Sequence, residues 1–208
     1  GEVRFDGRSL RGRKVHEIVA LGVVHIPQGD LIFADMTVRD NLLMGAYLPA
    51  AHAEAATRLA EIYTLLPTLD ERQDQTARTL SGGELQRVMV ATLVAQDAAV
   101  FLLDEPANHL DPAKQTSFYA MLRAQQHGGR GVLCITHDMN LLSHLGPADG
   151  DPGGAGAVRV VGMAEGQIRF ECPLDDAGLT EQLSALFELP LEAVTRGGRR
   201  YFLPGSSQ

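Results

Sequence analysis

The feature that most constrains the fold is an apolar run, Ala99-Val100-Phe101-Leu102-Leu103, which ends abruptly in Asp104-Glu105-Pro106. No polar residue interrupts the run, so a strand built from it has no face suited to water. Strands of this kind belong to the interior of parallel sheets that helices cover. The sequence therefore predicts a buried strand over residues 99–103 with two carboxylates at its carboxyl end.

Two more segments predict strands: Val23–Ile26, which Pro27 ends, and Val132–Thr136, which is expected to be buried. Helical patterns separate the three strands. A helix is expected to begin at Ser81. Another is expected to follow Asp111-Pro112, because Asp is a favoured N-cap and Pro a favoured first helical residue. Strands that alternate with helices predict an α/β fold with a parallel sheet.

The remaining segments predict elements around this sheet. Before the apolar run, the pattern favours a short helix over residues 14–21 and a helical insert from Val38 to about Leu69. The segment Gly146–Gly154 has the composition of a linker. After it we expect strands over 158–163 and 167–170, a helix over 179–187, and a hairpin of strands 191–195 and 200–203 that turns at Gly197-Gly198.

Composition and charge exclude several classes of protein. The net charge is −8, which argues against a general nucleic-acid binder because a phosphate backbone requires a basic face. The longest apolar stretch, Val88–Leu103, is broken by Gln96-Asp97 and is too short to span a membrane, and no signal peptide is visible. Two cysteines, Cys134 and Cys172, form no metal-binding spacing and fit a reducing compartment.

The segment Ser81-Gly82-Gly83-Glu84 predicts the start of a helix that can also bind an anion. Serine followed three residues later by glutamate is a capping box. Capping alone does not require the two glycines. Glycines allow backbone N–H groups to approach an anion closely, and the helix N-terminus adds a partial positive charge, so this turn suits a phosphate group.

Several candidate residues have plainer interpretations when each is taken alone. Asp104 and Glu105 could form a solvated turn after a strand, and Asp111 is an ordinary helix cap. His137 could be a capping or core histidine, and Gln28 could be a turn residue after Ile26-Pro27. Their order and spacing together indicate more than these separate roles.

Taken together, these motifs resemble the nucleotide site of ABC-type ATPases. In chain order, Gln28 matches the Q-loop glutamine, Leu80–Arg87 the signature and Ala99–Pro106 the Walker B motif. Asn108–Asp111 matches the D-loop, and His137 matches the switch histidine. Glu84 stands where the family's signature most often has Gln. The resemblance implies the fold of a P-loop NTPase, with a RecA-like ABC ATPase core, and covers nearly the whole chain.

The resemblance also implies a role for each residue. Asp104 would hold Mg²⁺ through water, and Glu105 would be the general base for the attacking water. His137 would contact the γ-phosphate of ATP, and Gln28 would link Mg²⁺ or water to the membrane subunits. The residues Ser81, Gly82, Gly83 and Asp111 would act across the dimer, where the signature turn binds the ATP held by the opposite subunit.

One expected motif is absent from the chain. The phosphate-binding loop ends in Gly-Lys-Ser or Gly-Lys-Thr, whereas the two lysines here, Lys14 and Lys114, lie in other contexts. We therefore expect a single ABC ATPase domain over 1–208 that is truncated at its N-terminus and lacks its Walker A segment, with a helical subdomain at about 36–80 and a C-terminal part at about 158–208. Alone it is expected to be inactive, and the strand at Ala99–Leu103 is expected to lack its central neighbour.

The resemblance implies an importer subunit that binds ATP and Mg²⁺. The segment from His16 to Tyr47 resembles ATPases of branched-chain amino acid importers, whereas His137–Leu141 and the tail Gly198–Pro204 resemble those of iron-siderophore, haem and cobalamin importers, which we favour. Implied partners are transmembrane permease subunits, a second copy in a homodimer and, indirectly, a periplasmic or extracellular substrate-binding protein, with no nucleic acid. The expected location is the cytoplasmic face of the inner (plasma) membrane, as a peripheral subunit. A non-transport ABC protein and a degenerate regulatory cassette are the alternatives.

Overall fold

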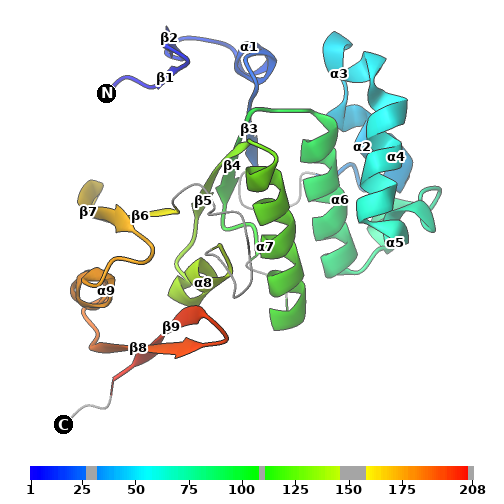
Figure 1. Ribbon diagram of the computed structural model, residues 1–208. Coiled ribbons are helices and arrows are strands. Elements are labelled where there is room, and N and C mark those ends of the chain that lie inside the picture. Colours follow the sequence, from blue (N-terminus) through cyan, green and yellow to red (C-terminus); the bar gives the residue numbers. More distant parts are fainter. Residues whose placement is uncertain (27–31, 108–110, 146–157, 206–208) are drawn as a thin grey trace. The chain divides into compact units, whose positions relative to one another are not determined.

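The computed structural model describes residues 1–26, 32–107, 111–145 and 158–205. Figure 1 shows the elements along the chain. The chain divides into two compact units, the first formed by residues 1–114 and 129–135 and the second by residues 115–128 and 136–208.

The first unit contains a small parallel sheet, a group of helices and a short N-terminal hairpin. Its elements are β1 (Arg4–Phe5), β2 (Arg8–Ser9), α1 (Val15–Ala20), β3 (Val23–Ile26), α2 (Val38–Gly45), α3 (Pro49–Ala53), α4 (Ala55–Leu65), α5 (Pro67–Asp70), the 3-10 helix η1 (Ala77–Thr79), α6 (Gly82–Ala95), β4 (Val100–Asp104) and β5 (Gly131–Ile135). Helix α7 (Pro112–His127) begins at the end of this unit and continues into the second.

The three parallel strands lie in the order β3-β4-β5, with β4 in the centre. In this register Leu103 pairs with Ile26 on one side and with Cys134 on the other. The predicted strands and their parallel arrangement are confirmed. The prediction that the Ala99–Leu103 strand lacks its central neighbour is wrong, because β4 has a hydrogen-bonded partner on both sides.

The two faces of this sheet differ in burial. On one face Phe101 and Leu103 are buried, at 0% and 1% exposure. On the other face Leu133 and Ile135 are 56% and 57% exposed, and Leu102 beside Leu133 is half-buried. The prediction that Val132–Thr136 is a buried strand is therefore wrong, because Val132 and Cys134 on the opposite side of β5 are only half-buried. An apolar run predicts burial of both faces, but the described residues cover only one face at this position.

The helices of the first unit share a hydrophobic core. Helices α2, α4 and α6 contribute Val38, Leu42, Ile62 and Val88, all buried. A methyl group at Gly45 would lie 2.4 Å from the backbone oxygen of Thr92, so α2 and α6 approach too closely for any side chain there. The helical pattern predicted for Val38–Leu69 is confirmed as a series of short helices.

The second unit combines two hairpins with helices. Besides most of α7, its elements are the 3-10 helix η2 (Met139–Leu141), α8 (Leu142–Leu145), β6 (Arg159–Ala164), β7 (Gln167–Pro173), α9 (Leu179–Phe187), β8 (Leu191–Arg196) and β9 (Arg199–Pro204). Its core includes Val160, Leu179 and Phe202, each at most 7% exposed. The predicted C-terminal helix and the hairpin turning at Gly197-Gly198 are confirmed, and both glycines have positive φ. The linker predicted at Gly146–Gly154 lies outside the described residues.

Candidate functional site

The two carboxylates of the predicted Walker B motif lie at the carboxyl end of the central strand. Asp104 is the last residue of β4, and the half-buried Glu105 follows it. The backbone N–H of Glu105 donates a hydrogen bond to the carbonyl oxygen of Ile135 on β5 at 3.0 Å. Open parallel sheets bind their ligands at this edge, so the sheet holds both carboxylates where a ligand can reach them.

Glu105 has an unusual backbone conformation. Its φ is +47°, in the left-handed region that residues with a side chain rarely adopt. Such strain persists where surrounding contacts fix it, and it is concentrated at functional sites. Pro106 disfavours a right-handed helical backbone at the preceding residue. This proline is a signal in the sequence that the strand ends in a special turn, but it does not reveal the sign of φ.

The turn before α6 forms the capping box that the sequence predicts. The Glu84 carboxylate accepts hydrogen bonds from the backbone N–H and the hydroxyl of Ser81, both at 2.8 Å. Arg72 lies 3.3 Å from the other carboxylate oxygen of Glu84. The hydrogen bonds from Ser81 lower the pKa of Glu84, with a smaller contribution from the charges of Arg72 and Arg87. Glu84 therefore stabilises the helix start as an anion.

The glycines of this turn have different surroundings. Gly82 is exposed, whereas Gly83 is buried. A methyl group placed on Gly82 would meet nothing within 4 Å, so packing within this chain does not require glycine there. The first N–H groups of an α-helix have no partner inside the helix. The start of α6 thus combines open space with backbone donors and the positive end of a helix dipole, which suits an oxyanion.

The other predicted site residues lie at the ends of elements or outside the described residues. Asp111 is exposed and directly precedes α7, which begins at Pro112 as predicted. His137 is exposed and follows β5 by two residues; next to it the hydroxyl of Thr136 accepts a hydrogen bond from the N–H of Asp138 at 3.1 Å. Gln28 and the D-loop residues Asn108–Leu110 lie outside the described residues.

The oxygen donors at the end of β4 fit a hard cation. Mg²⁺ in nucleotide sites keeps several waters and takes one or two protein carboxylates together with the phosphates of its substrate. Asp104 can supply such a ligand. In the ranges that the structure describes, no group of three or more His, Cys, Asp or Glu side chains could hold a metal ion.

None of the helices within the described ranges has both the length and the apolar character needed to cross a membrane.

Comparisons with known proteins agree with this arrangement. The family model described as "ABC transporter" matches residues 1–108. The chain is 30% identical to the hemin import ATP-binding protein HmuV of Rhizobium meliloti, over 90% of this chain and 70% of that protein. It is 27% identical to the high-affinity branched-chain amino acid transport ATP-binding protein BraG of Pseudomonas aeruginosa, over 67% of this chain and 60% of that protein.

Solved structures support the same fold. One ATP-binding cassette of an ABC transporter superposes on this chain with a TM-score of 0.73 at 20% identity. The superposition covers 90% of this chain and 76% of the cassette.

The chain spans 47 to 60% of the length of several curated relatives, BraG among them. The parallel sheet with carboxylates at its edge, the capped glycine turn and these matches lead to one assignment: the chain belongs to the ABC transporter family of ATP-binding cassettes and has the fold of a P-loop NTPase.

Proposed function

We propose that this chain is part of the ATP-hydrolysing subunit of an ABC importer. The observation that carries the proposal is the Asp104-Glu105 pair at the carboxyl end of the central strand, with Glu105 in a strained left-handed conformation. Strained residues are concentrated at functional sites, and an ATPase needs both a metal ligand and a base at such an edge.

In the proposed mechanism Asp104 would hold Mg²⁺ through water, the metal would neutralise charge on the phosphates, and Glu105 would accept a proton from the attacking water. His137 would contact the γ-phosphate, and Gln28 would link Mg²⁺ or the water to the membrane subunits. The turn Ser81-Gly82-Gly83 binds the γ-phosphate of ATP held by a second copy of the subunit, and Asp111 contributes to the same dimer contact. Backbone N–H groups at a helix start stabilise developing charge on a phosphoryl group.

The phosphate-binding loop is an essential part of such a site. No Gly-Lys-Ser or Gly-Lys-Thr sequence occurs within residues 1–208, and we propose that residues 1–208 alone bind Mg·ATP weakly. A calorimetric titration of this polypeptide with Mg·ATP measures that affinity. The activity proposed here is that of the gene product that contains these residues.

The partners are proposed from an exposed apolar surface near α2. This surface, which we call the α2 patch, consists of side chains 37 to 50% exposed: Phe33, Met36, Met44 and Tyr47. Exposed apolar groups gathered in one short stretch suit a partner helix. We propose that the α2 patch docks the permease subunits at the cytoplasmic face of the membrane, with a substrate-binding protein acting indirectly.

The transported substrate is proposed to be an iron chelate, haem or cobalamin, with a branched-chain amino acid as the alternative. The alignment with HmuV extends over 90% of the chain and that with BraG over 67%, which supports the first group. The permease and its binding protein determine which substrate is transported. Transport assays with the assembled complex therefore distinguish the iron-chelate, haem or cobalamin group from branched-chain amino acids.

The role of the α6 turn can be tested by Gly82→Asp. The open space at Gly82 accommodates the side chain, but the added carboxylate repels an anion. In the gene product that contains this chain, we expect ATP-driven dimerisation to be lost while the monomer binds ATP with an affinity within about twofold of wild type. Gel filtration and titration with a fluorescent nucleotide measure the two properties.

The matched control is His16→Asp, which adds a carboxylate to the exposed first turn of α1. This variant should dimerise normally. If Gly82→Asp weakens nucleotide binding by the monomer as much as it weakens dimerisation, the α6 turn is only a structural cap.

A further inference from the structure

The second unit contains a hollow whose lining is basic. The hollow has a volume of about 190 Å³ and lies between α7, α8 and the start of β9. From α7 the residues Thr116, Ala120, Arg123 and His127 line it. These positions are three or four residues apart, so they share one face of the helix.

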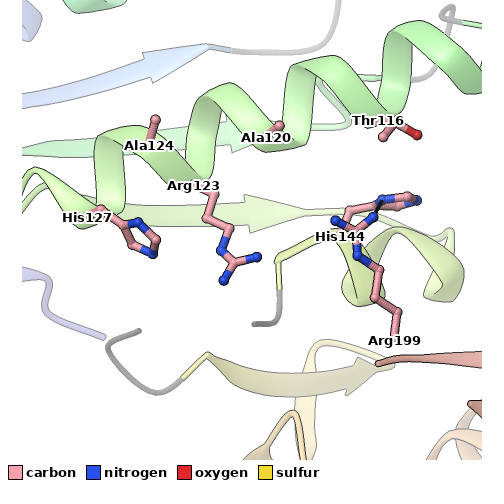
Figure 2. A pocket seen from close by; sticks show the side chains of 7 residues that line it. All are labelled: Thr116, Ala120, Arg123, Ala124, His127, His144 and Arg199. Carbon is pink, nitrogen blue, oxygen red and sulfur yellow. Dashed lines mark hydrogen bonds between the residues drawn. The ribbon is translucent and has the colours of Figure 1, made fainter. Parts of the chain in front are cut away.

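Two guanidinium groups and two imidazoles line this hollow. Arg123 and His127 come from α7, His144 from α8 and Arg199 from β9 (Figure 2). None of the lining residues, all in the described part of the chain, carries a carboxylate. This is notable in a chain with a net charge of −8. Arg123 is buried, at 8% exposure.

Contacts within the unit hold two of these side chains in place. A guanidinium nitrogen (Nη1) of Arg199 lies 2.9 Å from Nδ1 of His144. Arginine only donates, so Nδ1 accepts and His144 is neutral, with its proton on Nε2. Burial and the charge of Arg199 lower the pKa of His144, against an opposing effect of Asp138. The His144 ring also stacks on Tyr119 at 6.4 Å between centroids. A guanidinium has five N–H donors, so this single bond does not exhaust the capacity of Arg199.

We propose that this hollow binds a small phosphate-type oxyanion, either inorganic phosphate or the phosphoryl group of a small metabolite. Its volume corresponds to about six water molecules at roughly 30 Å³ each, which suits a phosphate group and is below the roughly 300 Å³ of pockets for larger ligands. Arginine forks match the geometry of phosphate oxygens and bind them through paired charge-assisted hydrogen bonds. Thr116 also lines the hollow.

The inference does not depend on the proposed ATPase function. The hollow is lined by none of the predicted nucleotide-site residues. Since those residues are also expected to attract phosphate, the test is carried out in a Gly82→Asp background, where the α6 turn repels anions.

The experiment is a calorimetric titration of the chain with inorganic phosphate, and separately with glycerol 3-phosphate, at constant ionic strength. We expect saturable binding that Arg199→Gln weakens about tenfold or more, because hydrogen bonds between charged groups contribute that much to affinity. Replacing the buried Arg123 could unfold the unit, so the second variant is Ala120→Glu. Position 120 is exposed on α7, and the new carboxylate is expected to repel the anion and weaken binding to a similar extent.

The matched control is Arg196→Gln. Arg196 pairs with Arg199 across the β8–β9 hairpin but does not line the hollow, so its loss should change the affinity by less than about twofold. Tighter binding of glycerol 3-phosphate would identify a phosphorylated metabolite, and tighter binding of inorganic phosphate would identify the free anion. Absence of saturable binding of both, or equal weakening by Arg196→Gln and Arg199→Gln, would overturn the proposal.

Discussion

At the scale of single residues, the left-handed backbone of Glu105 is strained, and contacts elsewhere in the sheet must compensate for its energetic cost. A left-handed backbone costs a residue with a side chain roughly 1–2 kcal/mol. The N–H of Glu105 bonds to the Ile135 carbonyl of the neighbouring strand, which helps to fix this conformation. The strain is therefore a feature of the edge of the sheet where β4 ends.

Glycine at position 105 should stabilise the chain relative to alanine. Glu105→Gly and Glu105→Ala both remove the side chain and its contacts, but only glycine accepts a positive φ without steric cost. We expect the glycine variant to be about 1 kcal/mol more stable, opposite to the usual order of the two residues in regular elements. Chemical denaturation measures this difference, and an alanine variant of equal or greater stability would show that residue 105 is unstrained.

Which site residues the sequence could predict depends on how local their interactions are. The Ser81–Glu84 capping box was predictable because serine and glutamate three positions apart suffice to form it. The conformation of Glu105 was not, since it involves a carbonyl group on β5, thirty residues further along the chain. The basic hollow was not predicted either. Arg123 and His127 give a helical spacing in the sequence, but His144 and Arg199 reach the hollow only through the fold.

At the scale of elements, Asp97 connects the end of α6 to its neighbours. Its carboxylate accepts hydrogen bonds from Arg58 of α4 at 2.6 Å and from Arg130, next to β5, at 2.8 Å. Partial burial opposes ionisation of Asp97, but the hydrogen bonds and charges of Arg58 and Arg130 outweigh it, so the pKa of Asp97 lies below its ordinary value. This network joins the helical part of the first unit to its sheet.

Asp97→Asn should destabilise the chain by about 1 kcal/mol at neutral pH, because asparagine tolerates the left-handed backbone at this position but removes the charge. A lowered pKa gives stability that is present above the ordinary pKa and lost as the pH falls through the folded-state pKa. The difference from wild type should therefore shrink at acidic pH, as denaturation at about pH 7 and about pH 3 would reveal.

The control for Asp97→Asn is Asp35→Asn. Asp35 pairs with Arg78 at 3.2 Å, but both side chains are largely exposed. Such an isolated surface pair contributes little, so its loss should leave stability nearly unchanged at both pH values. Equal effects of the two variants would mean that the Asp97 network has no special role.

The helical insert contains the surface proposed to dock the permease. Within α2, Leu43 is partly buried against the helical core, whereas its neighbour Met44 is 42% exposed in the α2 patch. Met44 is therefore the better probe. The apolar periodicity of the insert could not separate these two neighbours, because side chains that pack inside and side chains that bind a partner follow the same pattern.

Met44→Glu should uncouple transport from ATP hydrolysis. An unpaired carboxylate buried in an apolar interface weakens docking by about tenfold or more, while residue 44 lies outside the predicted nucleotide site. We expect substrate uptake by the reconstituted transporter to fall while ATP turnover persists. Leu65→Glu, at a 58% exposed position on α4, is the control and should leave uptake intact. Normal uptake with Met44→Glu would remove the α2 patch from the docking surface.

At the scale of the whole molecule, the order of elements was predictable because each strand and helix has its own hydrophobic period. The parallel order β3-β4-β5 and the C-terminal hairpin follow the predicted sequence of elements. Burial was harder to predict. The run that forms β5 is apolar on both faces, yet Leu133 and Ile135 are exposed among the described residues, because a sequence pattern shows which side chains avoid water without showing what covers them.

The central claim is that Glu105 is the base of an ATP-hydrolysing site, and Glu105→Gln tests it most directly. Glutamine keeps the length and shape of the side chain but cannot accept the proton of the attacking water. The measurement is ATP turnover by the gene product that contains this chain, with ATP binding and dimerisation followed in parallel. The account predicts that turnover falls by about 10²–10⁴-fold while ATP still binds and a closed dimer accumulates. Turnover by Glu105→Gln at the wild-type rate would contradict it.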